Sequence, residues 1–300
     1  MVAKSLKAIT STHSSSFKSP SLASVTTPPS STLEILTVPP KGRIQHALFD
    51  FDGTISLLRE GWQHVMQPMM LEMICGDTEP TPDLKEAVTV FIDETTGIQT
   101  IVQMEGLADL VRQHKCVPES AVLDAPGYKK IYNDRLMDRV LVRRKAVESG
   151  KLSIEDATVR GATSFVETLA DRGVAMYIFS GTDREDVQHE AELLGVAKHF
   201  KKITGSIGDY AAYNKERVIK ELMAEHNLAG PEVLVVGDGP VEIRHGRTHG
   251  CVTVGVASDE AAGEGWDEAK RKRLERAGAH VLVPNFAEFS QLLNAIFPNP

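Results

Sequence analysis

The sequence contains few of the residues that stabilise small secreted or zinc-dependent folds. Its 300 residues include only three cysteines, and none of them forms a CxxC or CxxH pair. A disulfide scaffold is therefore excluded, and a structural zinc site is not expected. The chain also lacks an apolar run of about 18 residues, the length that a membrane-spanning helix needs. We expect no association with a membrane.

Positive charge is scarce as well. The 33 lysines and arginines are outnumbered by 41 aspartates and glutamates, which gives a net charge of −8. Nucleic-acid-binding proteins usually carry a basic face, so a nucleic-acid partner is not expected. An acidic protein of this kind repels anionic substrates at long range. If it binds a phosphate group, it must do so through local hydrogen-bond donors or a divalent cation.

Acidic and aromatic residues are nearly absent from the N-terminal segment. Residues 1–33 contain no acid and a single aromatic residue, Phe17, and are rich in serine, threonine and proline. Such a segment buries too little surface to offset the entropy of ordering, so residues 1–40 are predicted to form a disordered tail. Its composition resembles a plastid transit peptide, but it lacks arginine and a clear amphipathic helix. A cytoplasmic location is predicted, with a plastid location as the alternative.

What the sequence does contain is an alternation of apolar strands and helices. Residues 46–51 (HALFDF) form a short apolar run, and similar runs recur after residue 173, separated by segments with helical spacing. Continuous apolar strands that alternate with helices indicate a parallel sheet covered on both faces. A mostly helical stretch, residues 58–153, interrupts this rhythm. The predicted organisation is an α/β core of residues 43–57 and 154–300, with a helical cap inserted at 58–153.

Polar side chains stand where these strands end. Asp50 and Asp52 follow the first strand, Ser180 and Gly181 the second, and Asp238 a later one. Ligands bind at the carboxyl ends of the strands in a parallel α/β sheet, so these residues are expected to face one point. Asp50 and Asp52 point the same way because side chains alternate along a strand, and they would repel each other without a cation. Three carboxylates of this kind suit Mg²⁺ paired with phosphate.

A lysine completes this set. Lys215 follows Asn214 at the start of a predicted helix and can offset phosphate charge, although Lys201 and Lys202 are nearby alternatives. One carboxylate can attack phosphorus while a second moves a proton to the leaving oxygen. Phosphoryl transfer needs mainly positioning and charge neutralisation, and this set provides both.

Four segments that carry these polar residues resemble, in their order along the chain, the motifs of the haloacid dehalogenase (HAD) superfamily of phosphohydrolases. Residues 49–54 (FDFDGT) match its DxDGT motif closely, and residues 237–242 (GDGPVE) are similar to its last motif. Ser180 and Lys215 match the two motifs between them. The resemblance spans residues 44–297, and it implies a Rossmannoid parallel-sheet core with a Mg²⁺ cofactor.

The resemblance implies a role for each acidic residue. Asp50 would be the nucleophile and a metal ligand. Asp52 would be the general acid/base, with its backbone carbonyl on Mg²⁺, and Asp238 would be a further metal ligand. The last motif often ends in a second aspartate, whereas this sequence has Glu242, which is expected to act on the metal through a water molecule.

The same resemblance implies the residues that hold the phosphoryl group. Ser180 and Gly181 would bind it, and Lys215 would stabilise it. Thr54 belongs to this phosphate-binding set and would hold the turn and orient Asp52.

The insertion between the first two motifs resembles the helical cap of the phosphoglycolate phosphatase and β-phosphoglucomutase branch. Arg59 and Trp62 follow the catalytic turn and are candidate substrate contacts, with an ordinary cap helix as the alternative. Residues 96–100 (TGIQT) break a helical stretch and are a candidate substrate loop. The basic run 270–276 (KRKRLER) is interpreted as a solvated helix face, because acids surround it.

The predicted function is a Mg²⁺-dependent phosphatase that acts through an aspartyl-phosphate intermediate. Its substrate would be a small phosphorylated metabolite, such as a sugar phosphate or a phosphoglycolate-like acid. A phosphomutase of the same fold shares the core residues and is the alternative. A non-catalytic binding protein built on the fold is a third possibility, which loss of Asp50 or Asp238 would have favoured. A monomer or a homodimer is expected.

Overall fold

A seven-stranded sheet forms the centre of the described chain. The computed structural model describes residues 33–207 and 213–297. The strand order is β1-β7-β6-β5-β2-β3-β4. Strands β2 to β7 are parallel, and β1 pairs antiparallel with β7. The strands are β1 (Glu34–Ile35), β2 (His46–Phe49), β3 (Ala175–Asp183), β4 (Phe200–Ser206), β5 (Val233–Gly237), β6 (Val252–Val256) and β7 (Val281–Val283).

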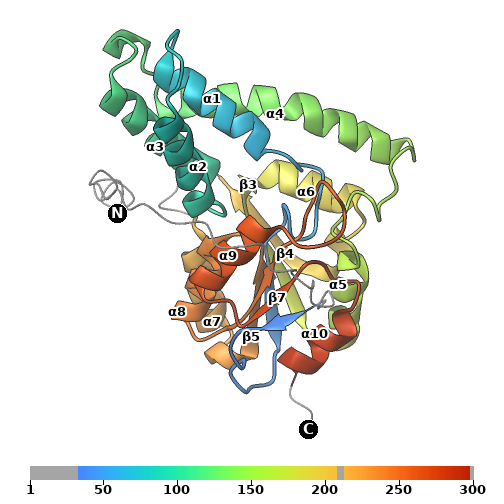
Figure 1. Cartoon of the computed structure of the whole chain (residues 1–300). Coiled ribbons are helices and arrows are strands. Elements are labelled where there is room, and N and C mark those ends of the chain that lie inside the picture. Colours follow the sequence, from blue (N-terminus) through green and yellow to red (C-terminus); the bar gives the residue numbers. More distant parts are fainter. Residues whose placement is uncertain (1–32, 208–212, 298–300) are drawn as a thin grey trace, which may run out of the picture. The chain divides into compact units, whose positions relative to one another are not determined.

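Helices cover both faces of this sheet (Figure 1). Successive strand side chains point to opposite faces, so Phe49 packs in one apolar cluster with Phe165, and Leu48 packs in another with Ile219. This two-sided burial explains why the strands read as continuous apolar runs. One face carries α5 (Ala162–Asp171), α6 (Arg184–Leu193) and α10 (Phe289–Ile296), and the other carries α7 (Lys215–Glu225), α8 (Pro240–Thr248) and α9 (Glu268–Ala277).

A helical insertion separates β2 from β3, as the sequence predicts (Figure 1). Thr81 and Asp124 begin two of its helices, because each side chain accepts a hydrogen bond from a backbone N–H of the first turn. No helix in the described segments is long and apolar enough to cross a membrane. The inserted helices are α1 (Gln63–Cys75), α2 (Pro82–Thr95), α3 (Thr100–His114) and α4 (Ala125–Glu148).

The two chain segments that join the insertion to the sheet lie side by side. Ser56 forms an antiparallel bridge with Thr158. The N–H of Leu57 donates to the carbonyl of Ala157 over 2.9 Å, and the N–H of Val159 donates to the carbonyl of Ile55 over 2.9 Å. Both connections therefore enter and leave the sheet at one place, next to the end of β2.

The predicted tail boundary at residue 40 is wrong. Residues 1–32, and with them the targeting segment considered above, lie outside the described residues. Strand β1, however, pairs with Val281 and Leu282 of β7. The side chain of Arg271 donates to the Glu34 carboxylate over 3.0 Å, and the N–H of Leu36 donates to the carbonyl of His280 over 2.9 Å. The sequence analysis missed this strand because two residues are too short for a detectable period.

We expect a chain of residues 41–300 to be less stable than a chain of residues 33–300. The shorter chain loses the β1–β7 hydrogen bonds and the Glu34–Arg271 ion pair. At about 1 kcal/mol per hydrogen bond, the loss is about 2 kcal/mol, which lowers the melting temperature by about 4–8 °C. Glu34→Gln in the longer chain removes only the ion pair. It should lower the melting temperature by less than half as much as the truncation does. Equal melting temperatures of the two chains would show that β1 contributes nothing.

Candidate active site

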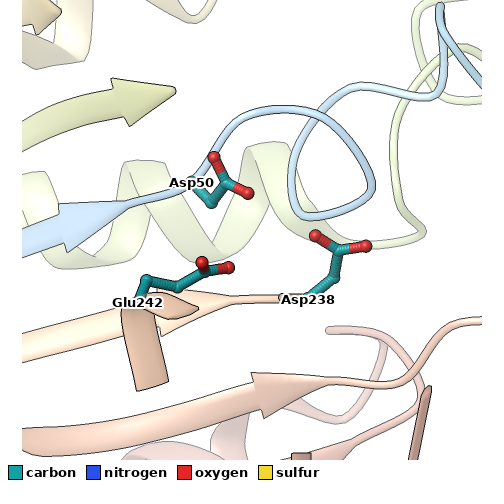
Figure 2. A group of neighbouring side chains, drawn as sticks. All are labelled: Asp50, Asp238 and Glu242. Carbon is teal, nitrogen blue, oxygen red and sulfur yellow. The ribbon is translucent and has the colours of Figure 1, made fainter. Parts of the chain in front are cut away.

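The carboxyl edge of the sheet brings together side chains from four separate segments. Asp50 follows β2, Asp238 follows β5, Lys215 is the first residue of α7, and Glu242 lies in the first turn of α8. Figure 2 shows the Asp50, Asp238 and Glu242 carboxylates facing one region. One oxygen of each lies within 4.8 Å of the others, and all three residues are buried. The convergence follows from β2 and β5 being adjacent parallel strands, whose ends meet at one edge.

Lys215 lies between two of these carboxylates. Its ammonium Nζ is 3.0 Å from Asp50 Oδ1 and 2.9 Å from Glu242 Oε2. Burial lowers the pKa of Lys215, but the carboxylates of Asp50 and Glu242 outweigh it and raise the pKa overall, so the lysine is charged. The Asn214 side chain accepts a hydrogen bond from the Arg217 N–H and so fixes the start of α7 at this lysine.

The Glu242 carboxylate has two direct hydrogen-bond partners, which the sequence did not predict. Its Oε1 accepts a hydrogen bond from the N–H of Gly239 over 2.7 Å, and its Oε2 binds Lys215. The carboxylate thus belongs to the same acidic group as Asp50 and Asp238. Its contact with a metal through a water molecule stays a prediction.

The three carboxylates of the acidic group carry more negative charge than Lys215 balances. Burial raises the pKa of Asp50 well above the usual range; Lys215 opposes this, and the Glu242, Asp238 and Asp52 carboxylates add to it. A divalent cation would relieve this repulsion, and hard carboxylate oxygens are the ligands that Mg²⁺ prefers. The donor set therefore fits the magnesium ion that the sequence predicts.

Gly53 allows the turn that follows β2 to lie close to the acidic group. Its φ of +71° lies in the left-handed region, and a Cβ at this position would be 2.5 Å from Asp238 Oδ2. Only glycine meets both conditions without strain. This is the physical reason for glycine in the DxDGT segment.

Asp52 is outside the acidic group and has different partners. Its Oδ2 accepts a hydrogen bond from the Thr182 hydroxyl over 2.7 Å, and its Oδ1 is 3.7 Å from Arg59 Nε. Oδ1 has no hydrogen-bond partner among the described residues. Burial raises the pKa of Asp52 to about 6; the Arg59 charge opposes this shift, and the Glu190 charge adds to it. A carboxyl group with this pKa can both give and take a proton near neutral pH.

The Ser180 segment lies beside the two aspartates. Ser180 and Gly181 line a cavity together with Asp50 and Asp52, and the Ser180 carbonyl accepts a hydrogen bond from the Tyr213 hydroxyl over 2.8 Å. Thr54 does not line this cavity. Its buried hydroxyl has no hydrogen-bond partner in the described part of the chain, so Thr182, and not Thr54, holds the Asp52 carboxylate.

The interpretation of residues 270–276 as a solvated helix face is wrong for two of them. Lys270 and Arg273 are only 2% and 5% exposed. Lys270 Nζ lies 3.1 Å from Asp238 Oδ2 and also contacts Glu260, while Arg273 donates to Asp93 over 2.9 Å. Leu274 follows them on the same helical face, and this apolar neighbour was the signal that the sequence offered. Lys270 is thus a second cation on the acidic group.

Arg59 is fixed by carboxylates of the core. Its Nη2 lies 2.8 Å from Glu190 Oε1 and 3.0 Å from Asp186 Oδ2, both on α6. Arg144, near the end of α4, binds the same two carboxylates. Arg59 lines the cavity, and its charge is matched by these acids, so its contact with a substrate stays a prediction. The sequence could not show these ion pairs, because Glu190 lies 131 positions away.

The cavity at the site has a volume of about 80 Å³ and lies between the insertion and the sheet edge. The Thr96–Thr100 loop joins α2 to α3 and contributes Thr96, Gly97, Ile98 and Thr100 to its lining. The carbonyl oxygen of Ile98 lies 2.4 Å from the position that a Cβ at Gly181 would occupy, so a side chain at Gly181 would collide with this loop. Trp62 lines the cavity as the sequence suggests, whereas Lys215 lies behind Asp50, outside the lining.

A buried glutamine holds this loop on the core. Gln99 is 2% exposed; its Oε1 accepts a hydrogen bond from the Ser206 hydroxyl over 3.0 Å, and its amide nitrogen donates to the carbonyl of Tyr213. The candidate substrate loop is thus held on the core and packs directly against Gly181.

Comparison with known proteins assigns this arrangement to a family. The family model of haloacid dehalogenase-like hydrolases matches residues 44–250. The chain belongs to the haloacid dehalogenase-like hydrolase family. No curated protein matches the sequence. The family match covers β2, the whole insertion and the strand ends that carry the acidic group, so the predicted HAD resemblance is confirmed.

Solved structures of HAD proteins share the fold of this chain at low sequence identity. A HAD-like hydrolase from Streptococcus pneumoniae has a TM-score of 0.54 and 17% identity, and the match covers 83% of this chain and 98% of that one. A predicted phosphoglycolate phosphatase from Haemophilus somnus has a TM-score of 0.57 and 13% identity, with coverages of 84% and 99%. A β-phosphoglucomutase from Clostridium difficile has a TM-score of 0.56 and 12% identity, with coverages of 84% and 97%. These similarities confirm the predicted HAD core with an inserted helical cap.

Proposed function

We propose that this HAD hydrolase is a Mg²⁺-dependent phosphatase that acts on a small phosphorylated metabolite through an aspartyl-phosphate intermediate. The observation that carries the proposal is the position of Asp50. Its carboxylate lines the cavity beside Ser180 and Gly181, and Lys215 and Asp238 lie against it. A nucleophile, phosphate donors and an acidic metal set therefore meet at one point.

In the first step, the Asp50 carboxylate attacks phosphorus and the bond from phosphorus to the ester oxygen breaks. Ser180 and the Gly181 amide bind phosphoryl oxygens. Lys215, 3.0 Å from Asp50 Oδ1, orients the nucleophile and offsets its charge. Asp50, Asp238 and the backbone carbonyl of Asp52 would hold Mg²⁺, which would supply positive charge that lets the anionic phosphoryl group approach a carboxylate.

Asp52 moves the protons of both steps. Protonated Asp52 gives its proton to the leaving oxygen as the ester bond breaks. The resulting carboxylate then takes a proton from water, which attacks the acyl-phosphate and regenerates Asp50 and inorganic phosphate. The Thr182 hydrogen bond fixes one oxygen of Asp52 and leaves the other, Oδ1, available for this transfer.

A phosphomutase is the second candidate, because a solved structure with this fold is described as a β-phosphoglucomutase. It would use the same aspartyl-phosphate but return the phosphoryl group to a sugar hydroxyl. A hexose 1-phosphate supplied with a trace of hexose 1,6-bisphosphate separates the two. Release of inorganic phosphate supports the phosphatase, and accumulation of hexose 6-phosphate supports the mutase.

Phosphate release from a panel of phosphate esters tests the proposal. We expect turnover with Mg²⁺, none in excess EDTA, and inhibition by Ca²⁺, whose larger and looser coordination misplaces the nucleophile. The panel contains p-nitrophenyl phosphate together with sugar, polyol and carboxylic-acid phosphates. Full turnover in EDTA would contradict the metal assignment, and no turnover on any ester would contradict the phosphatase.

Asp52→Asn is expected to slow hydrolysis according to the leaving group. An amide cannot give or take the proton, so an alkyl phosphate should lose about 10²–10⁴-fold in turnover. An aryl phosphate, whose leaving group needs no proton, should lose far less in the first step. Single-turnover rates for the two ester types check this. An equal loss on both would exclude Asp52 as the acid.

A further inference from the structure

We propose that the active-site cavity selects a phosphate ester whose leaving group is uncharged and carries hydroxyl groups, and that it discriminates against carboxylate-bearing esters. The inference rests on the proposed phosphatase function and deepens it, because it names the substrate class that the cavity accepts. The evidence for this inference is the set of charged residues that line the cavity.

Among the described residues, two cations line the cavity, and both are already paired with acids. Lys129 Nζ lies 2.5 Å from Asp183 Oδ1. Arg59 is shared by Asp186, Glu190 and Asp52, at 3.0, 2.8 and 3.7 Å. No cation of this lining is left over for a carboxylate on the substrate.

The acids of the same wall disfavour a second negative charge. Asp183, the last residue of β3, and Asp186, on α6, line the cavity beyond the catalytic aspartates. The lining holds five aspartates against these two cations, so a carboxylate on the leaving group would meet an excess of negative charge, and like charges repel. The phosphoryl group is not affected in this way, because the metal set and the Ser180 segment would hold it.

The remaining lining suits a neutral polyol or sugar. Thr100 and Asn133 present neutral groups that can donate to and accept from hydroxyls. Trp62, Tyr132 and Leu136 add apolar surface against which carbon–hydrogen faces can pack.

Matched pairs of esters test the inference. Glycerol 3-phosphate carries a hydroxymethyl group where 3-phosphoglycerate carries a carboxylate. Glucitol 6-phosphate and 6-phosphogluconate, both open-chain, form a second pair with the same difference. We expect the neutral member of at least one pair to have a kcat/KM roughly tenfold or more above its anionic partner, the scale set by one unmatched charge. p-Nitrophenyl phosphate serves as the common reference for catalysis.

Asp183→Asn provides the sharper test, because it leaves the Lys129 ammonium without its carboxylate. The ratio of kcat/KM for the anionic ester over its neutral partner should rise about tenfold, since a charge-assisted hydrogen bond becomes available. Adding Lys129→Gln to Asp183→Asn should reverse this gain. The ratio within a pair cancels any general loss of activity, so a merely structural effect would not move it.

The outcomes separate the two proposals. If p-nitrophenyl phosphate is hydrolysed but the anionic members are used as well as or better than the neutral ones, only the substrate inference is overturned. Hydrolysis of p-nitrophenyl phosphate with no use of either pair, or an unchanged ratio in Asp183→Asn, overturns it as well. If neither p-nitrophenyl phosphate nor any other ester of the panel is hydrolysed, the phosphatase proposal fails and the inference fails with it.

Discussion

Asp50→Asn is expected to abolish turnover on every phosphate ester. An amide oxygen cannot attack phosphorus to form an acyl-phosphate, so the loss should be on the order of 10⁶-fold, the scale for removal of a covalent nucleophile. The loss should not depend on the leaving group, in contrast to Asp52→Asn. Phosphate release and trapping of the phosphorylated protein by acid quench measure both the rate and the intermediate.

The fold should survive this substitution. Lys215 keeps its 2.9 Å contact with Glu242 when the Asp50 charge is removed, so no buried cation is left unpaired. Asp134→Asn is a matched control, because Asp134 is exposed and pairs only with Lys130 among the contacts described. The control should keep full activity. A labelled phosphoprotein formed by Asp50→Asn would assign the nucleophile to another residue.

Glu190→Gln is expected to cause the largest loss of stability. Glu190 is fully buried and binds the guanidinium groups of Arg59 and Arg144. Loss of its charge leaves two buried arginines with Asp186 as their main partner. Removing one partner of a buried ion pair costs about 3–5 kcal/mol, because the remaining charge stays desolvated.

Urea unfolding followed by fluorescence measures this loss. The midpoint for Glu190→Gln should fall clearly, while Glu192→Gln, two positions along but exposed, should change the free energy of unfolding by less than about 0.5 kcal/mol. Since Arg59 and Arg144 come from the two ends of the insertion, the variant should also loosen the insertion from α6. Identical midpoints for the two variants would show that the buried network contributes nothing to stability.

The sequence predicted those site residues whose positions depend on local structure. Asp50 and Asp238 directly follow the apolar strands β2 and β5, Ser180 follows the apolar residues of β3 within that strand, and the ends of parallel strands meet at one edge. Strand burial therefore predicted both the fold and the convergence of these three residues. Lys215 could be chosen over its alternatives because Asn214 begins a helix at that point.

Local patterns could not reveal which charges are buried. Lys270 occurs in a basic run that has the composition of a solvated helix, yet its ammonium binds Asp238. Arg59 follows the catalytic turn like a substrate contact, yet α6 supplies its partners. In both cases the environment of the charge depends on a residue that is distant in sequence.

By itself, the sequence determined the α/β fold, the helical insertion and the acidic centre at the strand ends. The signals for these features, the period of two along a strand and the apolar runs of strands buried on both faces, are visible within a few consecutive residues. Only the tertiary structure decided the pairing of β1 with β7, the contact of the Thr96–Thr100 loop with Gly181, and the matching of Arg59 and Lys129 by acids. These contacts join segments that are far apart in the chain, and their energies depend on desolvation and distance, which no local pattern encodes.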